Sequence, residues 1–68
     1  MLVQTKTELI KVLKERGMDY LLSLVTSRNL FDRLAGLGAI EMMGIFLSEN
    51  CIREVLREVI CNGKQDSV

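Results

Sequence analysis

The chain has 68 residues and a mass of 7.7 kDa, with nine basic side chains, nine acidic side chains and no histidine. A chain of this length buries only about 60% of the surface that its unfolded form exposes, which argues against a deep enzymatic cleft. The balanced charge provides no basic field of the kind that binding to nucleic acid requires. Apolar residues form 49% of the sequence, so we expect one globular domain over residues 1–68.

The first half of the chain predicts helices with recognisable ends. There is no proline and no long alternation of apolar and polar residues, so the expected fold class is all-α, a small bundle of about four helices. Thr5 and Glu8 have the spacing of a capping box at the start of a first helix, and Gly17 is placed to end it. Asp19 is expected to cap a short second helix over residues 20–25, and Asn29 a third helix.

The third helical stretch, residues 30–47, contains a conflict in its apolar pattern. In one straight helix, four residues share an apolar stripe: Leu30, Leu34, Leu37 and Ile45. Glu41 falls in the middle of that stripe, and burying an unpaired carboxylate is costly. A kink or break near Gly36–Gly38 removes the conflict, because each glycine weakens a helix by about 1 kcal/mol relative to alanine. We therefore expect the third helix to be kinked there.

Such a kink leaves one side of the second half of this helix without cover. That side carries the residues that we predict to bind a partner: Glu41, Met42, Ile45 and Phe46. A chain this short has no second layer of structure with which to cover them. The alternative is that the third helix is the buried centre of a self-sufficient bundle, in which Glu41 is paired or reaches solvent.

Residues 51–61 predict a fourth helix, with Asn50 as its cap and Gly63 after its end. Its apolar stripe consists of Ile52, Val55, Leu56, Val59 and Ile60. We expect Cys51 to be a boundary residue, between core and surface, near the start of this helix. We expect Cys61 to be exposed among the charges and residues 64–68 to form a frayed tail. The two cysteines would lie about 15 Å apart along the helix axis, which is too far for a disulfide.

The sequence contains no set of residues that predicts catalysis or metal binding. Without a histidine or a second cysteine pair, a zinc site would be incomplete. Glu54 and Glu58 are flanked by Arg53 and Arg57, which is typical of a solvated ionic face rather than of a pair of catalytic carboxylates. We therefore expect no enzyme activity, no catalytic or metal-binding residues and no cofactor.

The sequence also predicts where the protein resides. The first residues lack the basic region and apolar stretch of a secretory signal, so we expect a cytoplasmic protein. The longest apolar run, residues 34–47, contains Glu41 and is too short to cross a bilayer. We therefore expect no contact with a membrane.

The chain is similar to itself at an offset of 43 residues. Residues 7–15 align with residues 50–58, and both end in the order Val-Leu-basic-Glu. An offset of about 40–47 residues is the repeat length of armadillo and HEAT proteins. The stretch from Gly17 through residues 37–40 to Asn50 resembles one such unit, with a glycine-led helix before a longer one. The resemblance implies a protein-binding scaffold whose missing neighbours come from another chain, because such arrays need about three or more stacked units.

Taken together, the excess of apolar residues predicts self-association. The function we expect is a non-catalytic interaction or assembly module, acting as a homo-oligomer, most simply a dimer, with a further protein partner possible. The alternative is a small DNA-binding regulator that uses the basic side chains of the first helix: Lys6, Lys11, Lys14 and Arg16. Because the basic residues are otherwise spread among acidic ones, we expect nucleic acid to be the less favoured partner.

Overall fold

Two short segments that are far apart in the sequence pair as parallel strands. The computed structural model describes residues 1–57, and in it β1 (Leu2–Val3) lies beside β2 (Phe46–Leu47), with Leu2 opposite Phe46 and Val3 opposite Leu47. Because side chains alternate along a strand, Val3 and Leu47 enter the core, whereas Leu2 and Phe46 face outward. The sequence analysis missed this pair, since two-residue strands are too short to show an alternating pattern.

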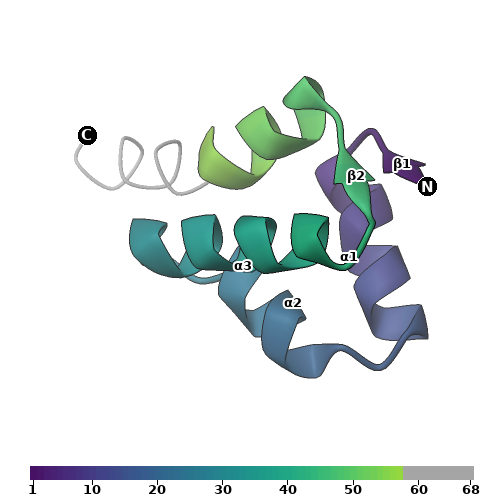
Figure 1. Cartoon of the computed structure of the whole chain (residues 1–68). Helices are drawn as coiled ribbons and strands as arrows, with labels where there is room; N and C mark the ends of the chain where they lie inside the picture. Colours follow the sequence, from purple (N-terminus) through teal and green to yellow (C-terminus); the bar gives the residue numbers. More distant parts are fainter. Residues whose placement is uncertain (58–68) are drawn as a thin grey trace.

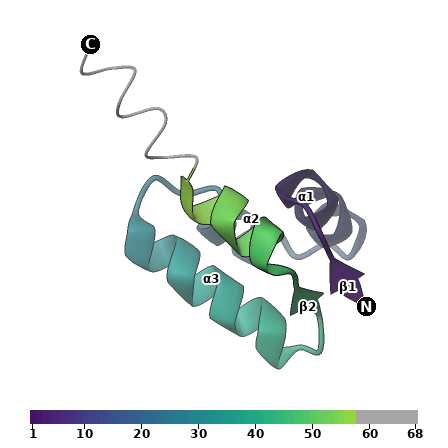
Figure 2. The same cartoon turned by 90° about the horizontal axis from the view of Figure 1, so that it is seen from above.

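Helices form most of the remaining described chain, which confirms the predicted small all-α bundle with a short second helix. They are α1 (Lys6–Glu15), α2 (Asp19–Val25), α3 (Leu30–Met42) and a further helix that begins at residue 49 and is described to residue 57. We call the last one helix 49–57. Figure 1 shows α3 lying across α2, and Figures 1 and 2 both show helix 49–57 alongside α3, with α1 next to β1.

Local capping sets both ends of α1 as predicted. The Thr5 Oγ1 accepts a hydrogen bond from the backbone N–H of Glu8 at 3.1 Å, and the Glu8 carboxylate accepts one from the N–H of Gln4 at 2.8 Å. At the other end Gly17 has a φ of 69°, and the N–H of Met18 donates to the carbonyl of Leu13 at 2.9 Å. This left-handed glycine ends the helix in a Schellman arrangement.

Of the N-terminal caps predicted for α2 and α3, one is wrong and one is confirmed. The predicted cap Asp19 is wrong, because Asp19 is the first helical residue of α2 and the capping position is held by Met18 without a side-chain hydrogen bond. The predicted cap Asn29 is confirmed. Its Oδ1 accepts from the N–H groups of Phe31 at 2.8 Å and Asp32 at 3.3 Å.

The predicted kink at Gly36–Gly38 is wrong, because α3 is one continuous helix from Leu30 to Met42. Gly36 serves helix packing instead. A Cβ at this position would lie 2.9 Å from the Cβ of Leu24 and 3.0 Å from Val25 Cγ1, both on α2. The helix ends where Gly44, with a φ of 87°, turns the chain toward β2. Residues 46–47 are therefore strand, although helix was expected there.

Helix 49–57 begins two residues earlier than predicted. Its cap is Ser48, whose Oγ accepts a hydrogen bond from the N–H of Cys51 at 3.0 Å. The expectation that Asn50 caps this helix is therefore wrong. The predictions for Cys61, for Gly63 and for the tail over residues 64–68 lie outside the described residues.

The core lies between the strand pair, α1, α2, α3 and helix 49–57. Its buried apolar residues are Val3, Leu9, Leu13, Val25, Leu37, Ile40, Ile45, Leu47, Cys51 and Val55. Cys51 is 0% exposed, so the expectation that it lies at the boundary is wrong. Its thiol contacts the start of α1, because the Cys51 Sγ lies 3.5 Å from the carbonyl oxygen of Thr5. The core thus leaves one face of α3 uncovered.

Candidate protein interface

The two faces of α3 differ in what covers them. The face toward α2 and helix 49–57 is buried and carries Arg33, Gly36, Leu37 and Ile40. At 100° per residue, the opposite face carries residues that are all exposed and all uncharged: Phe31, Leu34, Ala35, Gly38 and Met42. We call this set the α3 outer face. A helix of a soluble domain normally presents polar side chains on such a face.

The large side chains of the α3 outer face are widely open to solvent. Phe31 is 79% exposed, Met42 is 89% exposed and Leu34 is 46% exposed. Leu30 and Met43, at the two ends of the helix, are also about half exposed. Glu41 is exposed at the margin of this face, so its carboxylate is neither buried nor in conflict with the core. Because single chains rarely expose contiguous apolar patches, this face is the first candidate for an interface.

The structure separates the four residues predicted to bind a partner. Glu41 and Met42 lie near the end of α3, and both are exposed. Ile45 is 1% exposed and belongs to the core, so its assignment to a binding surface is wrong. The error has a simple cause, since the chain leaves the helix after Met42 and Ile45 enters the core ahead of β2. Phe46 is 61% exposed, but it lies on the strand pair opposite Leu2 rather than on α3.

The sequence analysis missed Phe31, Leu34, Ala35 and Gly38 as interface candidates. Their signal is present in the sequence, because Phe31, Ala35, Gly38 and Met42 follow one another at intervals of four, three and four residues. It was overlooked because Leu34 had been assigned to the buried stripe. Which side of α3 is buried depends on the contact of Gly36 with α2. This contact joins two helices, so the sequence of α3 alone does not reveal it.

The basic residue of α3 is not available on this surface. Arg33 is 3% exposed, and its guanidinium donates hydrogen bonds to the carbonyl oxygens of Ser27 at 2.9 Å and Leu56 at 3.3 Å. Its Nε has no hydrogen-bond partner among the described residues. Arg33 therefore ties the loop before α3 to helix 49–57, and it cannot reach a phosphate on the outer face.

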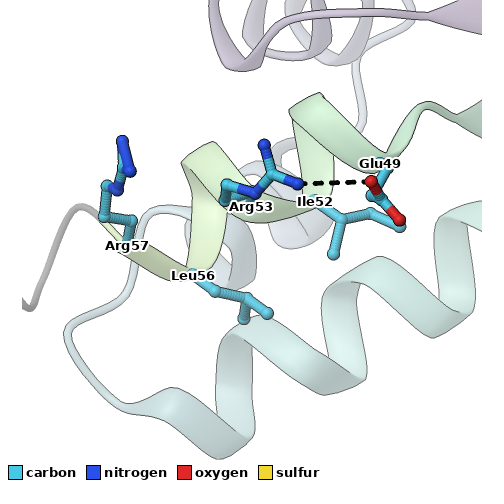
Figure 3. A pocket seen from close by; sticks show the side chains of 5 residues that line it. All are labelled: Glu49, Ile52, Arg53, Leu56 and Arg57. Carbon is cyan, nitrogen blue, oxygen red and sulfur yellow. Dashed lines mark hydrogen bonds and ion pairs between the residues drawn. The ribbon is translucent and has the colours of Figure 1, made fainter.

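A shallow groove lies along helix 49–57 (Figure 3). Its volume is about 470 Å³, and it is lined by Glu49, Ile52, Arg53, Leu56 and Arg57. Ile52 and Leu56 point toward α3, whereas Arg53 and Arg57 point away from it. Arg53 is paired with Glu49 at 3.2 Å, one helical turn earlier. The groove thus combines an apolar floor with an ionic rim, and its one carboxylate is engaged in that pair.

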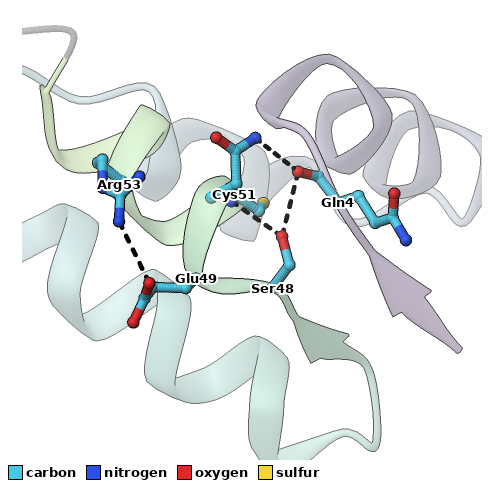
Figure 4. A network of polar contacts seen from close by, with 6 residues as sticks. Gln4, Ser48, Glu49, Cys51 and Arg53 are labelled. Atoms are coloured by element: carbon cyan, nitrogen blue, oxygen red, sulfur yellow. Dashed lines mark hydrogen bonds and ion pairs between the residues drawn. The ribbon is translucent and has the colours of Figure 1, made fainter.

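Polar contacts join the end of β1 to helix 49–57 (Figure 4). The Ser48 hydroxyl donates to the carbonyl oxygen of Gln4 at 3.1 Å, and the Asn50 side-chain amide donates to the same oxygen at 2.9 Å. Cys51 belongs to the same cluster, because its backbone N–H donates to the Ser48 hydroxyl oxygen at 3.0 Å. Burial raises the pKa of the Cys51 thiol to about 11, and the negative charges of Glu54 and Glu8 add to the shift. A thiol with so high a pKa is a poor nucleophile at neutral pH.

Residues 1–57 contain neither a metal-binding cluster nor a membrane-spanning helix. In this range no group of three or more His, Cys, Asp or Glu side chains is placed to hold a metal ion. The same range contains no helix with the length and apolar character needed to cross a membrane.

No protein-family model, no curated protein and no solved structure matches this chain. The resemblance to a single armadillo or HEAT unit stays a prediction.

Proposed function

We propose that this chain is a non-catalytic protein-interaction module that acts as a homo-oligomer, in a regulatory or assembly role. The observation that carries the proposal is the α3 outer face, on which Phe31 and Met42 are 79% and 89% exposed. Removing apolar surface from water contributes about 25 cal/mol for each Å² buried, which is partly offset by the entropy lost on association. A second copy of the chain offers the same apolar face, and two-fold dimers are the commonest homo-oligomers.

A second apolar area lies on the strand pair. Leu2 and Phe46 are 57% and 61% exposed and face outward side by side. This area belongs to different elements from the α3 outer face. It offers a matched control, because Phe31 and Phe46 are both exposed phenylalanines that can be replaced without disturbing the core.

The test is the solution mass of the chain by light scattering over a range of concentrations. We expect the mass to rise from that of the 7.7 kDa monomer toward that of a dimer as the concentration increases. Phe31→Asp should shift this rise to higher concentration, whereas Phe46→Asp should leave it in place. A mass of one chain at every concentration would contradict the proposal, and the reverse order of the two variants would move the interface to the strand pair.

The competing function is a DNA-binding regulator, and a separate measurement of binding to duplex DNA tests it. The chain would then bind duplex DNA at low salt and lose it steeply as the salt concentration rises. This function would use the basic side chains of α1, whereas the α3 outer face, which carries our proposal, contains no basic side chain. We therefore expect no binding of duplex DNA under conditions in which the chain self-associates.

A further inference from the structure

The α3 outer face has the residue spacing of a helix-pairing seam. Phe31, Ala35, Gly38 and Met42 are separated by four, three and four residues, so they alternate in the manner of the a and d positions of a coiled coil. All four are exposed in the single chain. Such a seam remains on one side of a helix and is suited to packing against a second helix along its length.

The order of residue sizes along this seam is symmetrical. A large residue stands at each end, and the two central positions hold alanine and glycine. Since the spacing of four, three and four reads the same in both directions, a second copy of α3 running the opposite way places large against large and small against small. The seam is therefore complementary to itself in the antiparallel orientation.

We propose that two copies of this chain pair through their α3 outer faces as an antiparallel helix pair with two-fold symmetry. Phe31 of each copy packs against Met42 of the other, and Ala35 packs against Gly38. This arrangement rests on the proposed function of self-association and specifies its geometry. Because Ala35 and Gly38 are small, the axes of the two α3 helices can approach closely at the centre of the pair.

Two features favour the antiparallel over the parallel orientation. It creates two contacts between the Met42 sulfur and the Phe31 ring, and contacts between sulfur and an aromatic ring are favourable. It also sets the positive N-terminal end of one helix dipole beside the negative C-terminal end of the other. A parallel pair would place like ends of the dipoles together and would match phenylalanine with phenylalanine.

The size of the seam indicates a reversible dimer. From Phe31 to Met42 the helix advances about 16 Å, and a helix with its side chains is about 10 Å wide. A face of this size is smaller than the roughly 800 Å² per partner of a standard interface. Contacts below the standard size are typical of weak or transient complexes, so we expect dissociation to be visible on dilution.

Gly38 provides a probe of the close approach. A Cβ at this position would meet no atom within 4 Å in the single chain, and Gly38 is exposed, so a larger side chain would extend into solvent. In the proposed pair, a large side chain at residue 38 would hold the two helices apart. Gly38→Leu should therefore abolish the dimer, while circular dichroism shows a wild-type helical content and the thermal stability of the single chain is no lower than that of wild type. Gly38→Ala is the matched control and should still dimerise.

The orientation is tested by complementation between two variants. Phe31→Glu and Met42→Lys each place a charge against an apolar residue, and each should raise the dissociation constant at least about ten-fold, which corresponds to about 1.4 kcal/mol. When the two variants are mixed in equal amounts, the introduced carboxylate faces the introduced amine at one end of the antiparallel pair. The other end keeps its native Phe31 and Met42. The mixture should therefore dimerise, and high salt should weaken it.

The outcomes of the Gly38 and mixing experiments distinguish failure of the antiparallel geometry, of the seam and of self-association itself. A mixture that stays monomeric while both single variants have lost dimerisation would overturn the antiparallel geometry. Wild-type dimerisation by Gly38→Leu would overturn the seam itself and leave the homo-oligomer proposal standing. A wild-type chain that is monomeric at every concentration would instead remove the proposed function. Restored dimerisation in the mixture, together with a monomeric Gly38→Leu, supports the geometry.

Discussion

Arg33 is the buried charged side chain of the described core, and its hydrogen bonds explain its position. Its two terminal nitrogens donate to backbone carbonyls of Ser27 and Leu56, which belong to segments far apart in the sequence. Hydrogen bonds that involve a charged group stabilise a fold more than neutral ones do. A buried guanidinium held in this way joins the α2–α3 loop to helix 49–57.

Replacement of Arg33 tests this role. Arg33→Ala should lower the free energy of unfolding by about 2–4 kcal/mol, because two charged hydrogen bonds and buried side-chain packing are lost together. Arg53→Ala is the control, since Arg53 forms an exposed pair with Glu49, and it should cost about 0.5 kcal/mol or less. Urea unfolding monitored by circular dichroism measures both values. Equal losses in the two variants would contradict a structural role for Arg33.

Cys51 should be unreactive as long as the chain is folded. Its pKa is raised to about 11, chiefly by burial, so the thiolate is scarce at pH 8. In a Cys61→Ser background, alkylation of Cys51 at pH 8 should be at least about 100-fold slower than in urea, because each pKa unit is a factor of ten in thiolate. Alkylation at the same rate in both conditions would show that the thiol is accessible in the folded chain.

The same pKa shift makes the stability depend on pH. The thiol ionises near its reference value of 9.0 in the unfolded chain but only near about 11 in the folded one. Above pH 9 the unfolded chain therefore loses its proton first, which favours unfolding. The stability that the protonated Cys51 thiol contributes is fully present below pH 9. The free energy of unfolding should therefore fall as the pH rises from 9 to 11. Cys51→Ala should show a smaller fall over this range.

At the scale of single elements, capping was predictable and helix phase was not. Thr5, Gly17 and Asn29 act on neighbours within a few residues, so their roles can be inferred from the sequence alone. The same reasoning failed at Asn50, because Ser48 competes for the cap and Asn50 is drawn to the carbonyl of Gln4. A contact with a distant segment decided that choice, and local patterns do not contain it.

Replacing the two glycines of α3 by alanine should change the free energy of unfolding in opposite directions. Gly38→Ala should raise the free energy of unfolding by up to about 1 kcal/mol, because it improves helix propensity and meets no atom within 4 Å. Gly36→Ala should lower it by about 1–3 kcal/mol, because its Cβ would come within 2.9 Å of the Leu24 Cβ. Urea unfolding of dilute samples measures both changes. A stabilising Gly36→Ala would contradict the close packing of α2 on α3.

At the scale of the whole molecule, the fold class could be predicted but the uncovered surface could be located only in part. The absence of proline and the helical periodicity are properties of composition, and they were sufficient for an all-α bundle of about four helices. The strand pair depends on residues 2–3 meeting residues 46–47, which no local pattern encodes. Since that pairing draws Ile45 into the core, the predicted binding surface retained Met42 and lost Ile45.

The central claim is that the α3 outer face is the surface through which two copies associate. Amide chemical shifts recorded by NMR during dilution of the wild-type chain test it most directly, because they report the contact residue by residue. We expect the shifts that change with concentration to cluster at Phe31, Ala35, Gly38 and Met42, while those of α1 stay fixed. Changes centred on Leu2 and Phe46, or no change over the whole range, would contradict the claim.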